Sequence, residues 1–533
     1  MSKPLGLVVS GSLDTGIQVR LDSSTSVEEM TVGRFITIEG EKHRFFGMIT
    51  DISLGVINDQ IIQTPPNDTF IAQVLTDAST YGMLDVLPML TIGNVAGHEE
   101  PQPVKTVPCH FSPVKLASDT DIESVFGKED EKRFWIGNPL DMETKLCLNL
   151  EEFVKRSNGI FGKSGTGKTF LTRIILIGIL QSKAVNLIFD MQNEYGYTGT
   201  KEGSGTVKGL KQLFEAKVAV FSLDEANSSR RISKPDAIVK ISYGDIEPED
   251  IVLMKHTLRL TDLAIAAIYP LHRAFGKEWI QRTMEVTAET LPEGLNVIHE
   301  STLHSLKRGL EFLKRLSFIQ EQQSAGKTAD DILRYLERGT NVVLEFGKHQ
   351  NIATYMFVAN MLSRRIYTSY QKRMENAMAS AEENTKPHPL VITIEEAHKF
   401  LNPEVADQTI FGTIAREMRK YNVTLLVIDQ RPSGISEEVM SQLGTKISCS
   451  LDNERDIDSV LAGVSGKKEL KGVLSKLASK QQALIFGHAV PMPVSFQVRE
   501  YGSAKSYDQF KSTNKSKTKS QAEEDAETDV IWD

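Results

Sequence analysis

The sequence predicts an α/β protein whose main domain is a mostly parallel β-sheet, preceded by a smaller β-rich segment. From about residue 151, short runs rich in Val and Ile alternate with helical stretches, which is typical of parallel strands buried on both faces. Before about residue 105, short alternating runs are separated by turn residues, which is typical of a small barrel or sandwich. The 533 residues, of which 40% are hydrophobic and 25% charged, suffice for several globular domains.

Strands are expected wherever these runs occur. In the N-terminal segment they are Leu5–Ser10, Gly16–Leu21, Arg34–Ile38 and Phe45–Ile52. In the sheet domain they are Val185–Phe189, Val218–Leu223, Val342–Phe346, Leu390–Ile394, Thr424–Ile428, Lys446–Leu451 and Gln482–Phe486. Residues 245–340 have helical spacing and no strong strand, so they are expected to form a helical insert within the sheet domain.

These patterns divide the chain into five units. They are a β-rich domain (1–105), a connector (106–150), the sheet domain (151–244 and 341–502), the helical insert (245–340) and a flexible charged tail (503–533). The tail has few apolar residues, and a lysine cluster is followed by an acidic one. Its terminal Val530-Ile531-Trp532 leaves open a second interpretation, a docking peptide for a partner.

Charge, cysteine content and the lack of long apolar stretches limit the classes of function and the compartments that the sequence suits. The net charge of −9 gives no support for a nucleic-acid-binding surface over the whole molecule, although a basic channel wall is compatible with it. The three cysteines lack metal-ligand spacing and suit a reducing compartment. The longest uncharged stretch, 481–498, contains Pro491 and Pro493 and does not fit a membrane span. The start of the chain does not fit a signal peptide, so we expect a cytoplasmic protein without membrane association.

A phosphate-binding motif is the strongest local signal. Residues 162–169, GKSGTGKT, match G-x-x-x-x-G-K-[ST] in full, between a strand end at Ile160-Phe161 and a helix start at Phe170. Glycines let backbone N–H groups converge on phosphate oxygens, and the helix N-terminus favours an anion. The motif predicts a P-loop core that binds ATP and Mg²⁺. The residues expected to bind the nucleotide are Gly162, Ser164, Gly165, Thr166, Gly167, Lys168 and Thr169.

Two carboxylates are the candidates for hydrolysis. The apolar strand Leu390–Ile394 ends in Glu395 and Glu396, where a nucleotide-hydrolysing sheet needs acids. We expect Glu395 and the Thr169 hydroxyl to hold Mg²⁺, and Glu396 to polarise the attacking water. The alternative is a strand that ends in solvated charges.

Three further residues follow in the chain. Gln430, just beyond the strand Val423–Ile428, is expected to contact the γ-phosphate and the water as a sensor; the alternative is an ordinary loop. Arg416 and Arg419 lie on a helix whose apolar residues recur at helical spacing, so both project away from the core. An arginine from a neighbouring subunit can neutralise charge on the γ-phosphate. The alternative for each is a solvated basic helix face.

Four segments together resemble the HerA helicase family, which belongs with the FtsK-like ring motors of the P-loop superfamily. They are RSNGIFGKSGTGKT (156–169), NLIFDMQNEYG (186–196), VITIEEAHKFL (391–401) and AREMRKYNVTLLVIDQRPS (415–433). The β-rich start, with VGRFITIEG and FFGMITDIS, looks like that family's N-terminal barrel. The likeness covers about residues 1–500. It implies a RecA-like ATPase core.

The resemblance also implies roles for particular residues. By position, Arg419 looks like the finger that acts across a subunit boundary, and Arg156 like a second charge stabiliser. Asp190 and Glu194 match the family's Asp…Glu-Tyr element, where they would contribute to nucleotide binding. This chain departs from the family in two places. Met191, Gln192 and Asn193 replace the usual Pro-His-Gly, and Glu395 stands where Asp is commoner.

Partners follow from the resemblance as well. Members form homohexameric rings that move double-stranded DNA through a central channel, beside a separate nuclease, often of the NurA kind. Some bacterial relatives are paired with nuclease or sirtuin-like effectors in phage defence. The loops Gly199–Lys208 and Asn227–Lys234 are candidates for DNA contact, with a solvated surface loop as the alternative for each.

Three functions remain open at this stage. The first is a DNA-stimulated ATPase motor. The second is a conjugation- or secretion-type ring ATPase. The third is a nucleotide-gated scaffold that assembles and switches a partner effector.

Overall fold

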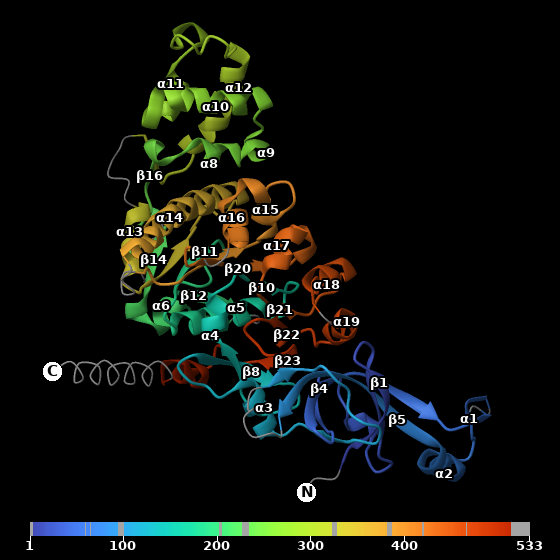
Figure 1. Cartoon of the computed structure of the whole chain (residues 1–533). Coiled ribbons are helices and arrows are strands. Elements are labelled where there is room, and N and C mark those ends of the chain that lie inside the picture. Colours follow the sequence, from blue (N-terminus) through green and yellow to red (C-terminus); the bar gives the residue numbers. More distant parts are fainter. Residues whose placement is uncertain are drawn as a thin grey trace, which may run out of the picture.

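The structure of the chain is a computed structural model, and two sheets organise it (Figure 1). It describes residues 4–58, 60–63, 65–93, 101–201, 205–225, 234–321, 328–380, 386–417, 420–464 and 466–512. Within this part of the chain, no helix combines the length and the apolar character that a membrane crossing needs.

The N-terminal sheet is a closed barrel. Its strands are β1 (Gly6–Ser12), β2 (Gly16–Leu21), β3 (Phe35–Glu39), β4 (His43–Val56), β5 (Thr80–Gly93), β6 (Gln102–Pro103) and β7 (Pro113–Leu116). The order is β2-β1-β7-β3-β4-β5-β6, and a further pairing between β2 and β5 closes the barrel. Inward-facing apolar side chains such as Val19, Ile36 and Ile49 are fully buried. Of the two expected architectures, barrel and sandwich, the barrel is confirmed.

The second sheet has 12 strands and carries the predicted phosphate loop. Its strands are β8 (Arg133–Pro139), β9 (Leu146–Asn149), β10 (Asn158–Phe161), β11 (Val185–Asp190), β14 (Val218–Ser222), β15 (Ala237–Ile238), β18 (Asn341–Glu345), β19 (Leu390–Glu395), β20 (Val423–Asp429), β21 (Thr445–Cys449), β22 (Gln482–Gly487) and β23 (Val494–Val498). The order is β15-β14-β18-β11-β19-β20-β10-β21-β22-β23-β8-β9. Pairings from β15 to β21 are parallel, and those from β21 to β9 are antiparallel. The predicted mostly parallel sheet is confirmed.

Helices cover both faces of this sheet (Figure 1). Those nearest the sheet are α4 (Leu150–Val154), α5 (Lys168–Leu180), α6 (Leu210–Leu213), α13 (Thr328–Glu337), α14 (Ile352–Ser380), α15 (His398–Leu401), α16 (Ile410–Glu417), α17 (Glu437–Gln442), α18 (Glu454–Val460) and α19 (Lys467–Ser475). Helix α5 is buried along most of its length because Ile174, Ile175 and Leu176 extend an apolar run all round it.

A helical subdomain stands apart at the top of Figure 1. It contains α8 (Pro248–Val252), α9 (Lys255–Leu258), α10 (Asp262–Phe275), α11 (Trp279–Glu285) and α12 (Glu300–Lys314). Trp279 is fully buried and donates its indole N–H to the Ile246 carbonyl at 2.9 Å. Two arginines of α14 reach up to this subdomain, where Arg364 pairs with Asp250 at 2.7 Å and Arg365 with Asp245 at 3.0 Å.

Two segments differ from the sequence-based expectation. The stretch 106–150, expected as a connector, contributes β7 to the barrel and β8 and β9 to the large sheet, with α3 (Asp119–Phe126) between them. Residues 504–512, expected in the flexible tail, are helical, and Phe510 is fully buried. The charged composition of the tail obscured the apolar spacing that predicts a helix here. Tyr507 and Phe510 are three residues apart, which places both rings on one helix face. Residues 513–533 lie outside the described part.

The ion pair between α14 and the helical subdomain is expected to stabilise the fold. Burial raises the pKa of Asp250, and the Arg364 guanidinium opposes that rise. Arg364→Ala leaves a carboxylate with 0% side-chain exposure uncompensated, so we expect a loss of about 3–5 kcal/mol of unfolding free energy. Urea denaturation followed by circular dichroism measures it. The control is Arg282→Ala, whose exposed pair with Glu278 is worth at most about 0.5 kcal/mol. Equal losses in the two variants would contradict the assignment.

Candidate nucleotide-binding site

The phosphate loop connects the end of β10 to the start of α5. Gly167 is the residue before the helix and has φ 91°, and Gly165 has φ 80°, a region that side chains with a Cβ adopt rarely. The glycines of the G-x-x-x-x-G-K-[ST] motif therefore form the tight turn that the motif predicts. The N-terminus of α5 faces the loop and supplies backbone N–H groups for an anion.

Neighbouring strand ends hold the loop in place. The Gly162 N–H donates to the Asp429 carbonyl at 3.3 Å, and the Lys163 N–H donates to the Ser450 carbonyl at 3.3 Å. On the other side the Gln481 N–H donates to the Thr166 carbonyl at 3.2 Å. The loop is thus fixed by β20, β21 and the segment before β22.

A cavity of about 420 Å³ opens over the loop, within the size range of small-molecule sites. Its walls are Lys163, Ser164, Gly165, Gly167, Lys168, Thr169, Phe170, Arg173, Glu194, Gln430, Lys480 and Gln481. Most of the predicted nucleotide-binding residues therefore share one cavity. Thr166 does not line it; its hydroxyl donates to the Lys163 carbonyl at 2.9 Å and braces the turn from within.

Lys168 lies among carboxylates. Burial lowers the pKa of its ammonium, while Asp429, Glu396 and Glu395 raise it. These acids come from the ends of β19 and β20, which are adjacent strands. The parallel sheet thus brings a lysine and three carboxylates together from three distant parts of the chain.

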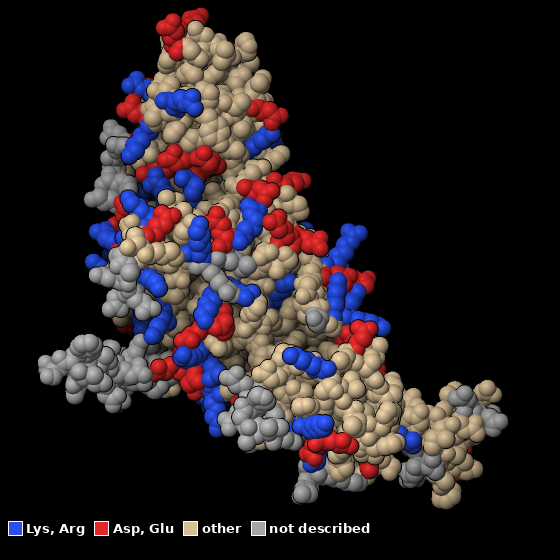
Figure 2. Space-filling model, viewed as in Figure 1, with Lys and Arg blue, Asp and Glu red and all other residues tan. Residues whose placement is uncertain are grey.

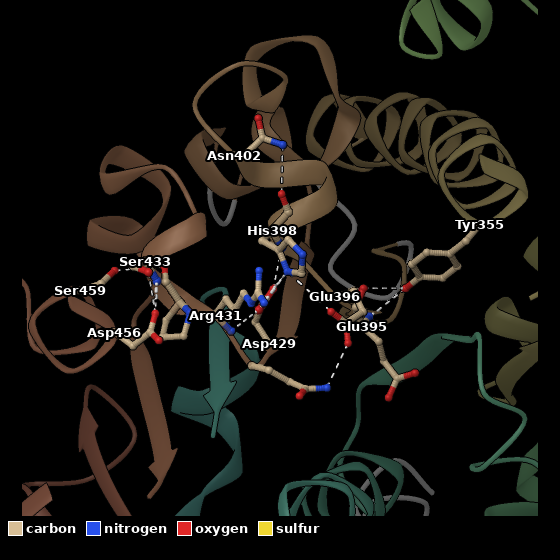
Figure 3. Close-up of polar contacts among 12 residues, drawn as sticks. Tyr355, Glu395, Glu396, His398, Asn402, Asp429, Arg431, Ser433, Asp456 and Ser459 are labelled. Atoms are coloured by element: carbon tan, nitrogen blue, oxygen red, sulfur yellow. Dashed lines mark hydrogen bonds and ion pairs between the residues drawn. The ribbon is translucent and has the colours of Figure 1, made fainter. Parts of the chain in front are cut away.

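Two tyrosines contact Glu395, one at its carboxylate and one at its backbone. The Tyr195 hydroxyl donates to its Oε1 at 2.7 Å, while Oε2 is enclosed and has no hydrogen-bond partner among the described residues. Burial raises the pKa of Glu395 to about 7. The Tyr355 hydroxyl fixes the backbone, because it accepts from the Glu395 N–H at 2.8 Å and donates to its carbonyl at 3.1 Å (Figure 3).

Glu396 turns away from the strand that carries it. Its φ of 49° lies in the left-handed region, which costs roughly 1 kcal/mol or more for a residue with a Cβ. The Gln430 amide donates to Glu396 Oε1 at 3.2 Å. The predicted base and the predicted sensor are therefore in direct contact.

Asp190 holds a loop next to the site. Its carboxylate accepts backbone N–H groups of Glu194 at 2.8 Å, Tyr195 at 2.7 Å and Gly196 at 3.3 Å. Burial raises the pKa of Asp190 to about 8, against those hydrogen bonds. Glu194 lines the cavity, whereas Asp190 is fully buried beneath it and acts on the site through the loop.

Of the three predicted arginines, the two that the structure describes, Arg416 and Arg156, do not line this cavity. Arg416 pairs with Asp407 on the surface. Arg156 precedes β10, so it lies at the opposite edge of the sheet from the phosphate loop and lines a separate cavity with Gly444. Arg419 lies outside the described residues, and its role stays a prediction.

Sequence reasoning missed three residues. Nδ1 of His398 lies 3.0 Å from Oδ2 of Asp429, beside Glu396, and Arg173 lines the cavity although it is almost fully buried. The Arg173 guanidinium donates to the Glu194 carbonyl at 2.9 Å. His398 and Asp429 stand inside the quoted motifs, but only the pairing of β19 with β20 places them side by side.

The donor set fits a magnesium ion. The Thr169 hydroxyl lines the cavity, and Glu395 adds a carboxylate with one unpartnered oxygen. Oxygen ligands of this kind, completed by phosphate oxygens and water, are what Mg²⁺ prefers.

The site consists of a strand, a glycine-rich loop and a helix whose N–H groups suit an anion, next to acids at the ends of β19 and β20. This combination defines a P-loop ATPase. The model of the "Helicase HerA, central domain" family matches residues 134–366, and that of the "HAS barrel domain" matches residues 5–94. The chain thus has a central domain similar to that of the HerA helicases, preceded by a domain similar to the HAS barrel.

Curated relatives agree with this assignment. The chain is 26% identical over 401 residues, 74% of each chain, to the DNA double-strand break repair helicase HerA of Sulfolobus acidocaldarius. It is 24% identical to the protein of that name from Pyrococcus furiosus, over 73% of each chain. With the one from Sulfurisphaera tokodaii it shares 23% identity over 93% of each chain.

The raised pKa of Glu395 predicts a pH-dependent stability of the protein without nucleotide or metal. Between about pH 4.5 and 7 the folded state keeps a proton that the unfolded state releases, so stability falls as pH rises through this window. Glu395→Gln cannot ionise and still accepts the Tyr195 hydrogen bond. We expect its Tm to exceed that of the wild type by on the order of 2 °C at pH 8 and to match it near pH 5.

Differential scanning fluorimetry in EDTA measures this effect. The control is Glu404→Gln, at an exposed position. A Tm difference for Glu395→Gln that does not change with pH would contradict the burial of an ionised Glu395.

Proposed function

We propose that this protein hydrolyses ATP to translocate double-stranded DNA, as a homohexameric ring. The observation that carries the proposal is the phosphate loop, whose Lys168 lies close enough to Glu395 and Glu396 for their charges to raise its pKa. Similarity to the HerA helicase central domain, and to curated relatives that are named as DNA double-strand break repair helicases, supports the choice of DNA as the track.

The geometry supports a division of labour among the residues. Loop N–H groups and Lys168 bind the phosphates, while Thr169 and Glu395 hold Mg²⁺. The ion, when bound, neutralises charge that develops on the transferred phosphoryl group. Glu396 orients the attacking water and accepts its proton, and Gln430, in contact with Glu396, senses the γ-phosphate.

A site shared between copies follows from the place of the arginines. The four residues of β10 span about 13 Å, so Arg156 at one end does not reach phosphates bound at the other. In a ring, the edge with Arg156 can face the nucleotide of the next copy. We assign Arg156, Arg416 and Arg419 to this role, with Arg419 as the finger by resemblance.

DNA contact is assigned to a hairpin beside the cavity. Strands β12 (Thr198–Lys201) and β13 (Gly205–Lys208) form it, and residues 202–204 lie outside the described part. The second candidate loop, Asn227–Lys234, also lies outside it except for Lys234. On the face in Figure 2, Lys and Arg are interspersed with Asp and Glu over the core, which supports phosphate contact inside a channel instead of on this face.

A separate effector completes the proposal. We propose a nuclease of the NurA kind as partner, or a nuclease or sirtuin-like effector in phage defence, since the resemblance implies such pairings. A nucleotide-gated scaffold that switches this effector is the second candidate, and a conjugation- or secretion-type ring ATPase is the third.

Steady-state ATP hydrolysis, with and without long duplex DNA and with a co-purified partner, tests the proposal. We expect DNA to stimulate the wild type. Lys168→Ala should lose nucleotide binding, and Glu396→Gln should bind ATP with kcat reduced about 10²–10⁴-fold. Lys399→Ala, an exposed lysine close to Glu396 in sequence, is the control and should keep full activity. Stimulation by the partner but not by DNA would overturn the motor in favour of the scaffold.

Mixed rings test the shared site. Arg419→Ala and Lys168→Ala subunits should each be inactive alone, because one lacks the finger and the other the phosphate lysine. When mixed, they should regain part of the activity, since intact half-sites meet at some boundaries. No regain at any mixing ratio would contradict a site built from two copies.

A further inference from the structure

Asp429 and His398 form a buried pair at the junction of two strands. His398 Nδ1 lies 3.1 Å from Asp429 Oδ1 and 3.0 Å from Oδ2, and the His398 backbone N–H donates to Oδ2 at 2.6 Å (Figure 3). The Arg431 N–H donates to Oδ1 at 2.6 Å. The Asp429 side chain is 0% exposed, so all its partners belong to the protein.

These contacts set the ionisation of Asp429 and the tautomer of His398. Burial alone raises the pKa of Asp429, but the hydrogen bonds from His398 and from the Arg431 backbone outweigh it and lower the pKa. An ionised carboxylate against Nδ1 keeps a proton on that nitrogen, as in sites where an acid orients a histidine. The imidazole is therefore fixed in one orientation.

The fixed imidazole faces Glu396. Nδ1 lies 3.7 Å from Glu396 Oε2, while Gln430 donates to the other oxygen, Oε1, at 3.2 Å. Gln430 follows Asp429 directly, so both contacts depend on the end of β20. The left-handed backbone of Glu396 removes it from the regular strand. Gln430 holds Oε1 by a hydrogen bond, and the imidazole lies beside Oε2 beyond hydrogen-bond distance.

We propose that His398, oriented by Asp429, is a positioning residue for Glu396. It acts through Glu396 and does not touch the nucleotide. This inference rests on the proposed function, in which Glu396 handles the attacking water. The consequence is that loss of His398 affects turnover and spares ATP binding.

The same three side chains bring ligand atoms within 4.8 Å of one another, as a cation site would. The contacts favour the hydrogen-bonded arrangement. Both oxygens of Asp429 already accept backbone N–H groups, and Nδ1 lies within hydrogen-bond distance of both. A metal would require Nδ1 without its proton.

Three substitutions at His398 distinguish a positioning role from a packing role. His398→Asn places its amide nitrogen where Nδ1 lies, His398→Gln places it about one bond further out, and His398→Ala removes the donor. We expect kcat of His398→Ala and His398→Gln to fall about 10–100-fold, with KM for ATP changed less than about 2-fold. His398→Asn should recover most of the lost kcat. His304→Asn, at an exposed histidine of α12, is the control and should match the wild type.

A double-mutant cycle completes the test. In the Glu396→Gln background the residual rate should not fall further on His398→Ala, because the group that His398 positions is already gone. Binding of a fluorescent ATP analogue and the Tm confirm that each variant is folded.

The outcomes are distinguishable. If the wild type hydrolyses ATP but His398→Asn is as slow as His398→Ala, or the losses at His398 and Glu396 add, this inference alone fails. It also fails if ATP binding is lost together with kcat. If the wild type does not hydrolyse ATP at all, the proposed function fails and the inference fails with it.

Discussion

The site depends on how a buried sheet edge accommodates several carboxylates around one lysine. Strands β11, β19 and β20 end in Asp190, Glu395 and Asp429, and each acid meets this constraint differently. Asp190 accepts three backbone N–H groups, and Asp429 accepts backbone N–H groups and a histidine. Glu395 has a single phenol on one oxygen and no hydrogen-bond partner on the other among the described residues, and burial raises its pKa to about 7. Glu395 is thus the acid that has a carboxylate oxygen without a hydrogen bond among the described residues, and that oxygen is available to a cation. For this reason Glu395 stays a candidate ligand, although its side chain is one methylene longer than that of Asp.

Much of the fold was predictable because the signals are local. Val- and Ile-rich runs give buried strands, and the glycine spacing of residues 162–169 gives the turn whatever follows it. Contacts that depend on strand order were not predictable. His398 and Asp429 are 31 residues apart, and nothing in either segment indicates that β19 and β20 are neighbours. The same holds for β8 and β9, which lie at the far edge of the large sheet, in a stretch whose prolines and charges around residues 103–115 suggested a connector.

That edge explains how barrel and core are joined. The chain leaves the barrel after β7, passes through α3 and enters the large sheet as β8 and β9, beside β23. Arg499, just after β23, lies 4.1 Å from the ring centres of Trp135 in β8 and of Phe510 near the end of the described chain. An arginine stacked between two aromatic rings secures this edge, where β9 is the last strand of the sheet; among the described residues no carboxylate pairs with this arginine. The barrel and the last helical turn are therefore anchored on the same strands.

The loop after β11 connects that anchoring to the chemistry. It begins at Asp190, passes Tyr195, whose hydroxyl holds Glu395, and continues into the β12–β13 hairpin. Arg173, one helical turn beyond Thr169, donates to the same loop, and the hairpin ends at Lys208, whose backbone bonds to Tyr501 and Tyr507. A displacement of the hairpin that does not stop within the few residues before it therefore moves Tyr195, whose one hydrogen bond contacts Glu395. Since Glu395 has no second partner among the described residues to hold it, its carboxylate is the group in the site most exposed to such a displacement. The β12–β13 hairpin is thus connected to Glu395 through the loop that carries Tyr195 and one side-chain hydrogen bond.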